Sequence, residues 1–124
     1  MQLTPLLSIY AVVTGFFGVA LLGVPRHLMG VYGAPSLDPL ETTLSRFVGA
    51  LFAGLAVMAW TGRATEAGKA RDAMVLGLTV LNGLSAVVAI IAALSGVFNA
   101  LAWGQAALYA VFTVLFVMAG RASM

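Results

Sequence analysis

The amino-acid sequence predicts an all-α integral membrane protein in which four transmembrane helices form one antiparallel bundle, a single domain over residues 1–124. Of its 124 residues, 62% are hydrophobic and only 8% are charged, whereas soluble domains carry about 25% charged residues. The apolar residues gather in four stretches, each long enough to cross a hydrocarbon core of roughly 30 Å as a helix. Nearly every position within them is apolar, which excludes a transmembrane β-barrel, because barrel strands alternate in polarity.

The first stretch runs from about residue 3 to residue 24 and stops before Pro25, since proline cannot continue a helix cleanly. In the loop that follows, residues 26–32 alternate between polar and apolar side chains. This alternation predicts a short helix that lies in the membrane interface. We expect the Gly-Ala-Pro of residues 33–35 to end that helix.

The second stretch, from about residue 39 to residue 60, has the best-marked start. Asp38 can cap the helix, because an aspartate oxygen accepts a hydrogen bond from a backbone N–H of the first turn. Pro39 suits the first helical position, where no N–H is needed. Glu41 follows in the first turn, where a negative charge is favoured. The sequence therefore predicts a well-defined helix start at this point.

The third stretch runs from about residue 72 to residue 94, and the fourth from about residue 98 to residue 119. Only the three residues 95–97 separate them. A connection of this length allows no crossing of the bilayer between the two helices. We therefore expect the last two helices to form a tight antiparallel hairpin.

Basic residues are concentrated on one side of the predicted bundle, with Arg63, Lys69 and Arg71 in the middle loop and Arg121 after the last stretch. Cytoplasmic loops of membrane proteins carry an excess of Lys and Arg. We therefore expect both termini and the middle loop in the cytoplasm. The predicted location is the bacterial cytoplasmic (inner) membrane, which the chain crosses several times.

Arg46 is the most informative polar residue, because it lies about two turns inside the second stretch. A charge at the centre of a bilayer costs about 2.5–3.5 kcal/mol, and less near the edge. Two interpretations remain open. The side chain can extend to the membrane surface, since helical side chains lean toward the helix N-terminus. Alternatively, it can face the bundle and hold a carboxylate, a lipid phosphate or another polar ligand.

Polar side chains on the last two stretches fall on single helix faces. Asn82 and Ser85 are three residues apart, and Gln105 and Tyr109 are four apart, so each pair lies along one stripe. Antiparallel packing would bring these residues near Arg46 and form a polar seam. The seam is either a set of interhelical hydrogen bonds, which contribute about 0.6 kcal/mol each, or a binding site for a partner or ligand.

The sequence contains no arrangement typical of catalysis, so we expect no enzymatic activity. It has no cysteine, and its one histidine, His27, lies just beyond the first stretch. There a cation is favoured by the helix C-terminus, although the side chain could also ligate a haem or chlorophyll metal. No Asp or Glu lies inside the predicted membrane core, which argues against proton-coupled antiport. We expect no cofactor beyond a bound lipid, quinone or pigment.

Two further features carry a family resemblance. The second stretch contains RFVGALFAGLAVMAW from Arg46 to Trp60, an Arg-x-x-Gly-x-x-x-x-Gly pattern, and the fourth contains Trp103 and Gln105. Together with the proline-ended first stretch, these residues resemble the DoxX-like group of small bacterial four-helix membrane proteins. The resemblance implies a role beside membrane oxidoreductases that work with quinones, as in some members of that group. The chain lacks an arginine in its first stretch, which departs from the group's pattern, and no catalytic residue is carried over.

Three hypotheses of function follow. The first is a non-catalytic accessory or assembly subunit that packs against other membrane subunits of a larger complex, or against a second copy of itself. The second is a binder or carrier of a lipophilic small molecule, such as a lipid, quinone or pigment, in the polar seam. The third, from the resemblance alone, is a subunit of a quinone-linked oxidoreductase. Membrane lipids are expected partners in each case, and nucleic acid is not, because the six basic residues are scattered.

Overall fold

The computed structural model describes residues 2–33 and 37–122, and these residues form five α-helices and no strand. In chain order the helices are α1 (Leu3–Gly23), α2 (Pro25–Val31), α3 (Pro39–Gly62), α4 (Lys69–Leu94) and α5 (Leu101–Ala122). All except the short α2 are long and apolar enough to cross a membrane. The predicted all-α class and its four candidate spans are therefore confirmed over the part of the chain that the structure describes.

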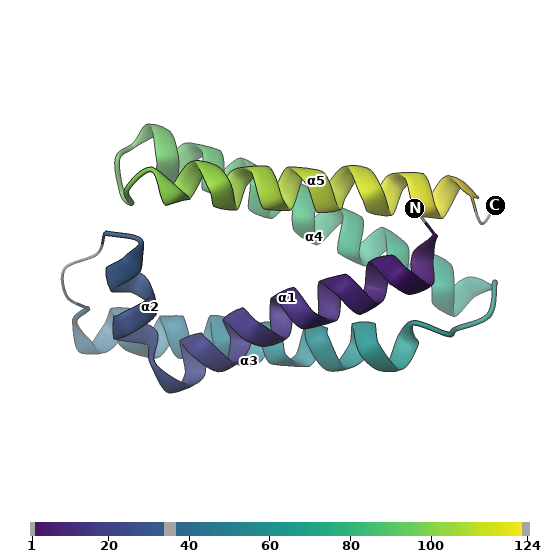
Figure 1. Ribbon diagram of the computed structural model, residues 1–124, viewed down its shortest axis with the longest axis horizontal. Coiled ribbons are helices and arrows are strands. Elements are labelled where there is room, and N and C mark those ends of the chain that lie inside the picture. Colours follow the sequence, from purple (N-terminus) through teal and green to yellow (C-terminus); the bar gives the residue numbers. More distant parts are fainter. Residues whose placement is uncertain (1, 34–36, 123–124) are drawn as a thin grey trace.

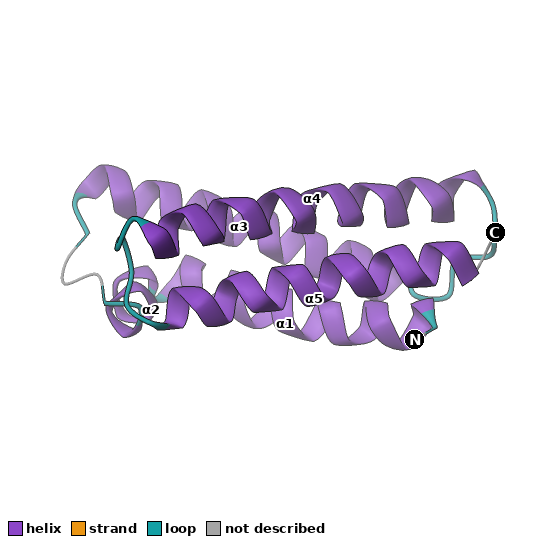
Figure 2. Ribbon diagram, turned by 90° about the horizontal axis from the view of Figure 1, so that it is seen from above, coloured by secondary structure: helices purple, strands orange, loops and turns teal. Residues whose placement is uncertain are grey.

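The long helices form two antiparallel pairs, in which α1 packs along α3 and α4 packs along α5 (Figures 1 and 2). The start of α1, the end of α5 and the α3–α4 connection lie at one end of the bundle, which we call the terminal end (Figure 1). The short α2 and the α4–α5 connection lie at the opposite end, which we call the α2 end. α1 approaches α5 at the terminal end and diverges from it toward the α2 end.

The main core lies at the terminal end, where α1 meets α4 and α5. Leu6, Leu7, Tyr10 and Phe116 are almost completely buried there. The Tyr10 ring meets the rings of Phe112 and Phe116 edge-on, with centroid separations of 4.9 and 5.2 Å. Because edge-to-face pairs contribute about 0.5–1.5 kcal/mol beyond simple burial, this aromatic cluster holds the two helix pairs together.

α1 and α3 come close enough for their backbones to touch at two glycines. A Cβ atom on Gly18 would lie 2.8 Å from the Ala53 nitrogen, and one on Gly49 would lie 2.9 Å from the Gly18 oxygen. Small residues commonly permit such close approach between membrane helices. Gly54, on the same helix as Gly49, has nothing within 4 Å of its Cβ position, so only part of α3 packs in this way.

The starts of two helices follow from local sequence, as predicted. The Asp38 carboxylate accepts a hydrogen bond of 2.7 Å from the Glu41 N–H and caps α3. The expected short helix is present as α2, and Gly33 follows it with a φ of +93°, a conformation that glycine adopts readily. The other two residues expected to end this helix, Ala34 and Pro35, lie outside the described residues.

Two other helix starts differ from the prediction. α4 begins at Lys69, because Gly68 adopts a φ of +154° and its carbonyl accepts the Asp72 N–H at 3.0 Å. α5 begins at Leu101, because the Asn99 side chain accepts a hydrogen bond of 3.0 Å from the Leu101 N–H. The connection between α4 and α5 is therefore longer than the three-residue turn that the apolar pattern suggested.

Apolar side chains cover the outward faces of all four long helices. The most exposed of them include Val12, Val19, Leu51, Leu76, Val88 and Leu94. A soluble monomer rarely exposes a contiguous apolar surface of this extent. The architecture is therefore consistent with a multi-pass membrane protein whose outer surface contacts lipid.

Candidate functional site: a cavity between the helix pairs

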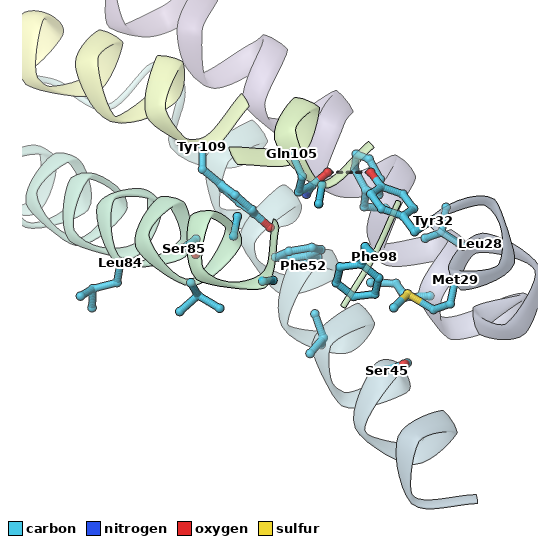
Figure 3. A pocket seen from close by; sticks show the side chains of 17 residues that line it. Leu28, Met29, Tyr32, Ser45, Phe52, Leu84, Ser85, Phe98, Gln105 and Tyr109 are labelled. Carbon is cyan, nitrogen blue, oxygen red and sulfur yellow. Dashed lines mark hydrogen bonds between the residues drawn. The ribbon is translucent and has the colours of Figure 1, made fainter. Parts of the chain in front are cut away.

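A cavity of about 540 Å³ lies between the two helix pairs at the α2 end. All five helices contribute to its walls, and so does the α4–α5 connection through Phe98 (Figure 3). Most of the lining is aliphatic or aromatic, including Phe17, Leu21, Val48, Phe52 and Ala92. The divergence of α1 from α5 thus leaves a space that the available side chains do not fill.

The cavity reaches the outer surface of the bundle along α4. Two of its lining residues, Leu84 and Val88, are 63% and 66% exposed. On the facing side, Val48 of α3 is also exposed and also lines the cavity. Because α3 and α4 are not closely packed against each other, the cavity opens sideways between them.

A small group of neutral polar side chains lies within this apolar surrounding. Gln105 is its centre: the Tyr32 hydroxyl donates a hydrogen bond of 2.7 Å to its Oε1 (Figure 3). Tyr109, one turn further along α5, lines the same cavity. Ser85 and Ser45 face the cavity from α4 and α3. No Asp, Glu, Lys, Arg or His stands among the described residues that line it.

Tyr32 also helps to fix α2 as one wall of the cavity. Its carbonyl accepts a hydrogen bond of 2.9 Å from the Asn99 N–H, and the Asn99 side chain donates to the Val31 carbonyl at 2.9 Å. The Tyr32 ring packs edge-on against Phe98, with centroids 5.9 Å apart. Burial raises the pKa of the Tyr32 hydroxyl, so the phenol stays protonated and can donate to Gln105.

Asn82 occupies the deep end of the site and is completely buried, with an exposure of 0%. Its Nδ2 donates to the Leu78 carbonyl at 2.8 Å and to the Tyr10 hydroxyl at 3.3 Å. Its Oδ1 is buried without a hydrogen-bond partner among the described residues. An unpaired buried acceptor of this kind costs about 1–3 kcal/mol, so its presence calls for an explanation.

A second, much smaller void of about 10 Å³ adjoins Asn82. It is lined partly by Tyr10 and Thr14 of α1, and it shares Gln105 and Tyr109 with the main cavity. The two spaces therefore meet at the same polar side chains. Together they form one site with a large apolar chamber and a narrow floor beside Asn82, where a few polar side chains stand among apolar ones.

A model of one protein family matches residues 1–120 of the sequence. The chain belongs to this family, which is described as a domain of unknown function, DUF8292. No curated protein and no solved structure matches the DUF8292 chain significantly. The resemblance to the DoxX-like group stays a prediction, because the family match carries no information about it.

The structure brings together four of the five residues that the sequence singled out. Ser85, Gln105 and Tyr109 line the cavity, and Asn82 lies at its floor. Arg46 lies apart: its side chain is exposed on α3 and does not line the cavity, although its neighbour Ser45 does. The role of Arg46 in recognition therefore stays a prediction.

Sequence reasoning missed one polar residue of the site, Tyr32. Tyr32 follows the short α2, and nothing in the sequence indicates that it would reach Gln105, 73 positions away. Tyr10 lies four residues before Thr14, whose hydroxyl donates to the Tyr10 carbonyl at 2.7 Å. This polar pair inside an apolar stretch is the sequence signal for the contribution of α1.

His27 is exposed on α2 and takes no part in the cavity. Within residues 2–33 and 37–122, no group of three or more His, Cys, Asp or Glu side chains could hold a metal ion. The chemistry available at the site is therefore hydrogen bonding by neutral groups inside an apolar chamber.

Proposed function

We propose that the protein is a non-catalytic, multi-pass protein of the bacterial cytoplasmic membrane that binds a lipophilic molecule from the bilayer. The observation that carries this proposal is the cavity of about 540 Å³ between the helix pairs. Small-molecule sites typically measure about 300–1,000 Å³ and combine apolar walls with a few polar groups that orient the ligand. The cavity meets both criteria, with Gln105 and Tyr109 as central polar groups.

The route into the cavity supports a ligand that arrives from lipid rather than from water. The exposed side chains of Val48, Leu84 and Val88 form an apolar edge between α3 and α4. At the α2 end, by contrast, Asn99 hydrogen-bonds the carbonyls of Val31 and Tyr32 and ties α2, which forms part of the cavity wall, to the α4–α5 connection. A molecule that partitions into the bilayer reaches the lateral edge without crossing an aqueous phase.

The distribution of basic residues supports an orientation for this site. Lys69, Arg71 and Arg121 lie at the terminal end, which the excess of positive charge assigns to the cytoplasm. The α2 end and the cavity then lie in the outer half of the bilayer. In this orientation the protein would take up its ligand from the outer leaflet.

The proposal is tested by filling the cavity. Ala89 is a half-buried lining residue of α4, whereas Ala110 is exposed on α5 and lines neither cavity. Native mass spectrometry of protein extracted from its own membranes should reveal a bound lipophilic molecule in the wild type and in Ala110→Phe. In Ala89→Phe the phenyl ring should reduce its occupancy at least about tenfold, equivalent to about 1.4 kcal/mol. Equal occupancy in all three proteins would refute the proposal.

A second candidate, the accessory subunit, is favoured by the outward face of α3. Arg46, Ala50 and Gly54 are exposed and follow one another at intervals of four residues, so they lie along one stripe. A Cβ on Gly54 would meet nothing within 4 Å, which leaves room for a helix of another subunit or of a second copy. An arginine on such a face could pair with a partner's carboxylate or a lipid phosphate.

Arg46→Leu and Arg46→Lys separate this candidate from the first. If the face binds a partner through the planar guanidinium, both substitutions should remove co-purifying polypeptides in native gels, because an ammonium cannot replace a bidentate contact. Binding in the cavity should be unchanged, since Arg46 does not line it. Migration of the wild type as a partner-free particle of 12.8 kDa plus detergent would exclude the subunit role.

A further inference from the structure

The orientation of the Asn82 amide is fixed by its neighbours. The atom 2.8 Å from the Leu78 carbonyl oxygen must be the amide nitrogen, because two carbonyl oxygens would repel each other. The same nitrogen reaches the Tyr10 hydroxyl at 3.3 Å, so both of its hydrogens are used. Oδ1 is therefore a fully buried acceptor that still needs a donor from outside the described protein groups.

Two phenols, those of Tyr10 and Tyr109, line the same small void as Asn82. The Tyr10 hydroxyl accepts from Asn82, and the Tyr109 side chain lines the same void as both of them. Each phenol then retains its own hydrogen for a further acceptor. The floor of the site thus offers one acceptor, Oδ1, and phenolic donors around a void of about 10 Å³.

These groups determine which functional group the ligand must carry. A hydrocarbon leaves Oδ1 unpaired, and a ketone, ester or ether can accept from a phenol but cannot donate to Oδ1. A carboxylate or phosphate would be buried with no cation among the described lining residues, which strongly disfavours it. A hydroxyl group both donates and accepts, and its oxygen is about the size of a water molecule, which such a void can just hold.

We infer that the ligand is an uncharged lipophilic alcohol whose hydroxyl enters the void beside Asn82, while its apolar body fills the larger cavity. The hydroxyl donates to Asn82 Oδ1 and accepts from the phenol of Tyr10 or Tyr109. This assignment rests on the proposed binding function and adds the head group that the site selects. A single-chain alcohol and a glycerolipid with one free hydroxyl share this chemistry.

The full-length protein in detergent is tested with matched probes: 1-hexadecanol, hexadecyl methyl ether, a diacylglycerol and the corresponding triacylglycerol. Competition against radiolabelled 1-hexadecanol measures the affinity of each. We expect the methyl ether to bind at least about tenfold more weakly than the alcohol, because it cannot donate. Of the two glycerolipids only diacylglycerol should compete. Its affinity relative to that of hexadecanol shows whether the site prefers a glycerolipid with a free hydroxyl or a single-chain alcohol.

The variant Asn82→Leu should abolish this discrimination, so that the alcohol and the ether bind equally. Thr79→Val is the matched control: Thr79 lies one turn away on α4, donates to its own helix at Val75 and lines neither cavity. It should keep the wild-type preference. Since the comparison of probes on the wild type needs no variant, the inference stays testable even if Asn82→Leu fails to fold.

The outcomes distinguish the hydroxyl assignment from the proposed binding function. Equal binding of alcohol and ether to the wild type would overturn the hydroxyl assignment and leave the binding function intact. Retention of the preference for the alcohol in Asn82→Leu would also overturn the hydroxyl assignment, because the preference would then not depend on Oδ1. In that case a trapped water, rather than the ligand, donates to Oδ1 in the wild type. If no probe binds the wild type, and Ala89→Phe alters no native occupancy, the proposed function itself fails.

Discussion

The two ends of the bundle are built from the same four long helices but are packed in opposite ways. At the terminal end, Leu6, Leu7 and Phe116 are completely buried and fill the space between the pairs. At the α2 end, alanines and serines such as Ala92 and Ser85 face a cavity of about 540 Å³. Side-chain volume and helix divergence, rather than the number of helices, therefore decide where this protein is solid and where it is hollow.

The difference also separates stability from binding. Contacts between the helix pairs are concentrated where the Tyr10, Phe112 and Phe116 rings meet. The polar groups that can recognise a ligand lie mostly beyond this cluster, toward the α2 end. Substitutions at the terminal end should thus change the free energy of unfolding, and substitutions at the α2 end should mainly change ligand occupancy.

The largest effect is expected from Phe116→Ala at the terminal end. Removal of this buried ring should reduce the free energy of unfolding by roughly 3 kcal/mol, because it leaves a cavity in the core. Phe47→Ala is the control, since Phe47 is 64% exposed on α3. Unfolding in mixed micelles measures both, and an equal loss in the two variants would contradict the assignment of the core.

A smaller loss is expected from Gly49→Ala, where α1 and α3 touch. The new methyl group would lie 2.9 Å from backbone atoms of α1, so the helices must separate at a cost of about 1–3 kcal/mol. Gly54→Ala adds the same group to open space on the same helix. It should be neutral or stabilising by up to about 1 kcal/mol, because alanine favours helix more than glycine does. The reverse order of stability would exclude the close approach.

The smallest effect is expected from Tyr32→Phe at the α2 end. This substitution removes the hydrogen bond to Gln105 but keeps the ring against Phe98. Its cost should be about 1 kcal/mol or less, below the scatter of many unfolding measurements. Hydrogen exchange should nevertheless report faster exchange of the α2 amides and a shorter residence time of bound ligand. Unchanged exchange would mean that the Asn99 contacts alone hold α2.

Features that depend on local sequence were predictable, and the all-α class with four candidate spans was among them. Runs of apolar residues require helices in a bilayer, and the Asp38 cap is formed by residues three apart. The start of α5 was misplaced because Asn99 caps it from within an apolar pattern. The pairing of α1 with α3 could not be predicted, because nearly every face of these helices is apolar.

The candidate site was partly predictable, because some of its residues follow the helical period along the chain. Gln105 and Tyr109 share a stripe that the helical period places on one face, and both line the cavity. Arg46 was expected near them. It lies three residues before the buried Gly49, so the two side chains point about 60° apart around the helix axis. This difference is enough to place Arg46 on the exposed side of α3. Tyr32 was missed because its position depends on contacts with Asn99 in a distant connection.

The attachment of α2 has a consequence for the order in which the protein matures. α2 precedes α3 in the chain, yet its last turn is held by Asn99, which is made after α4. Because synthesis proceeds from the N-terminus, α2 cannot dock on this connection until α4 has been made. The wall of the cavity that α2 forms is therefore completed only after the first three long helices have been made. A chain truncated before residue 99 should keep the first helix pair but leave α2 undocked.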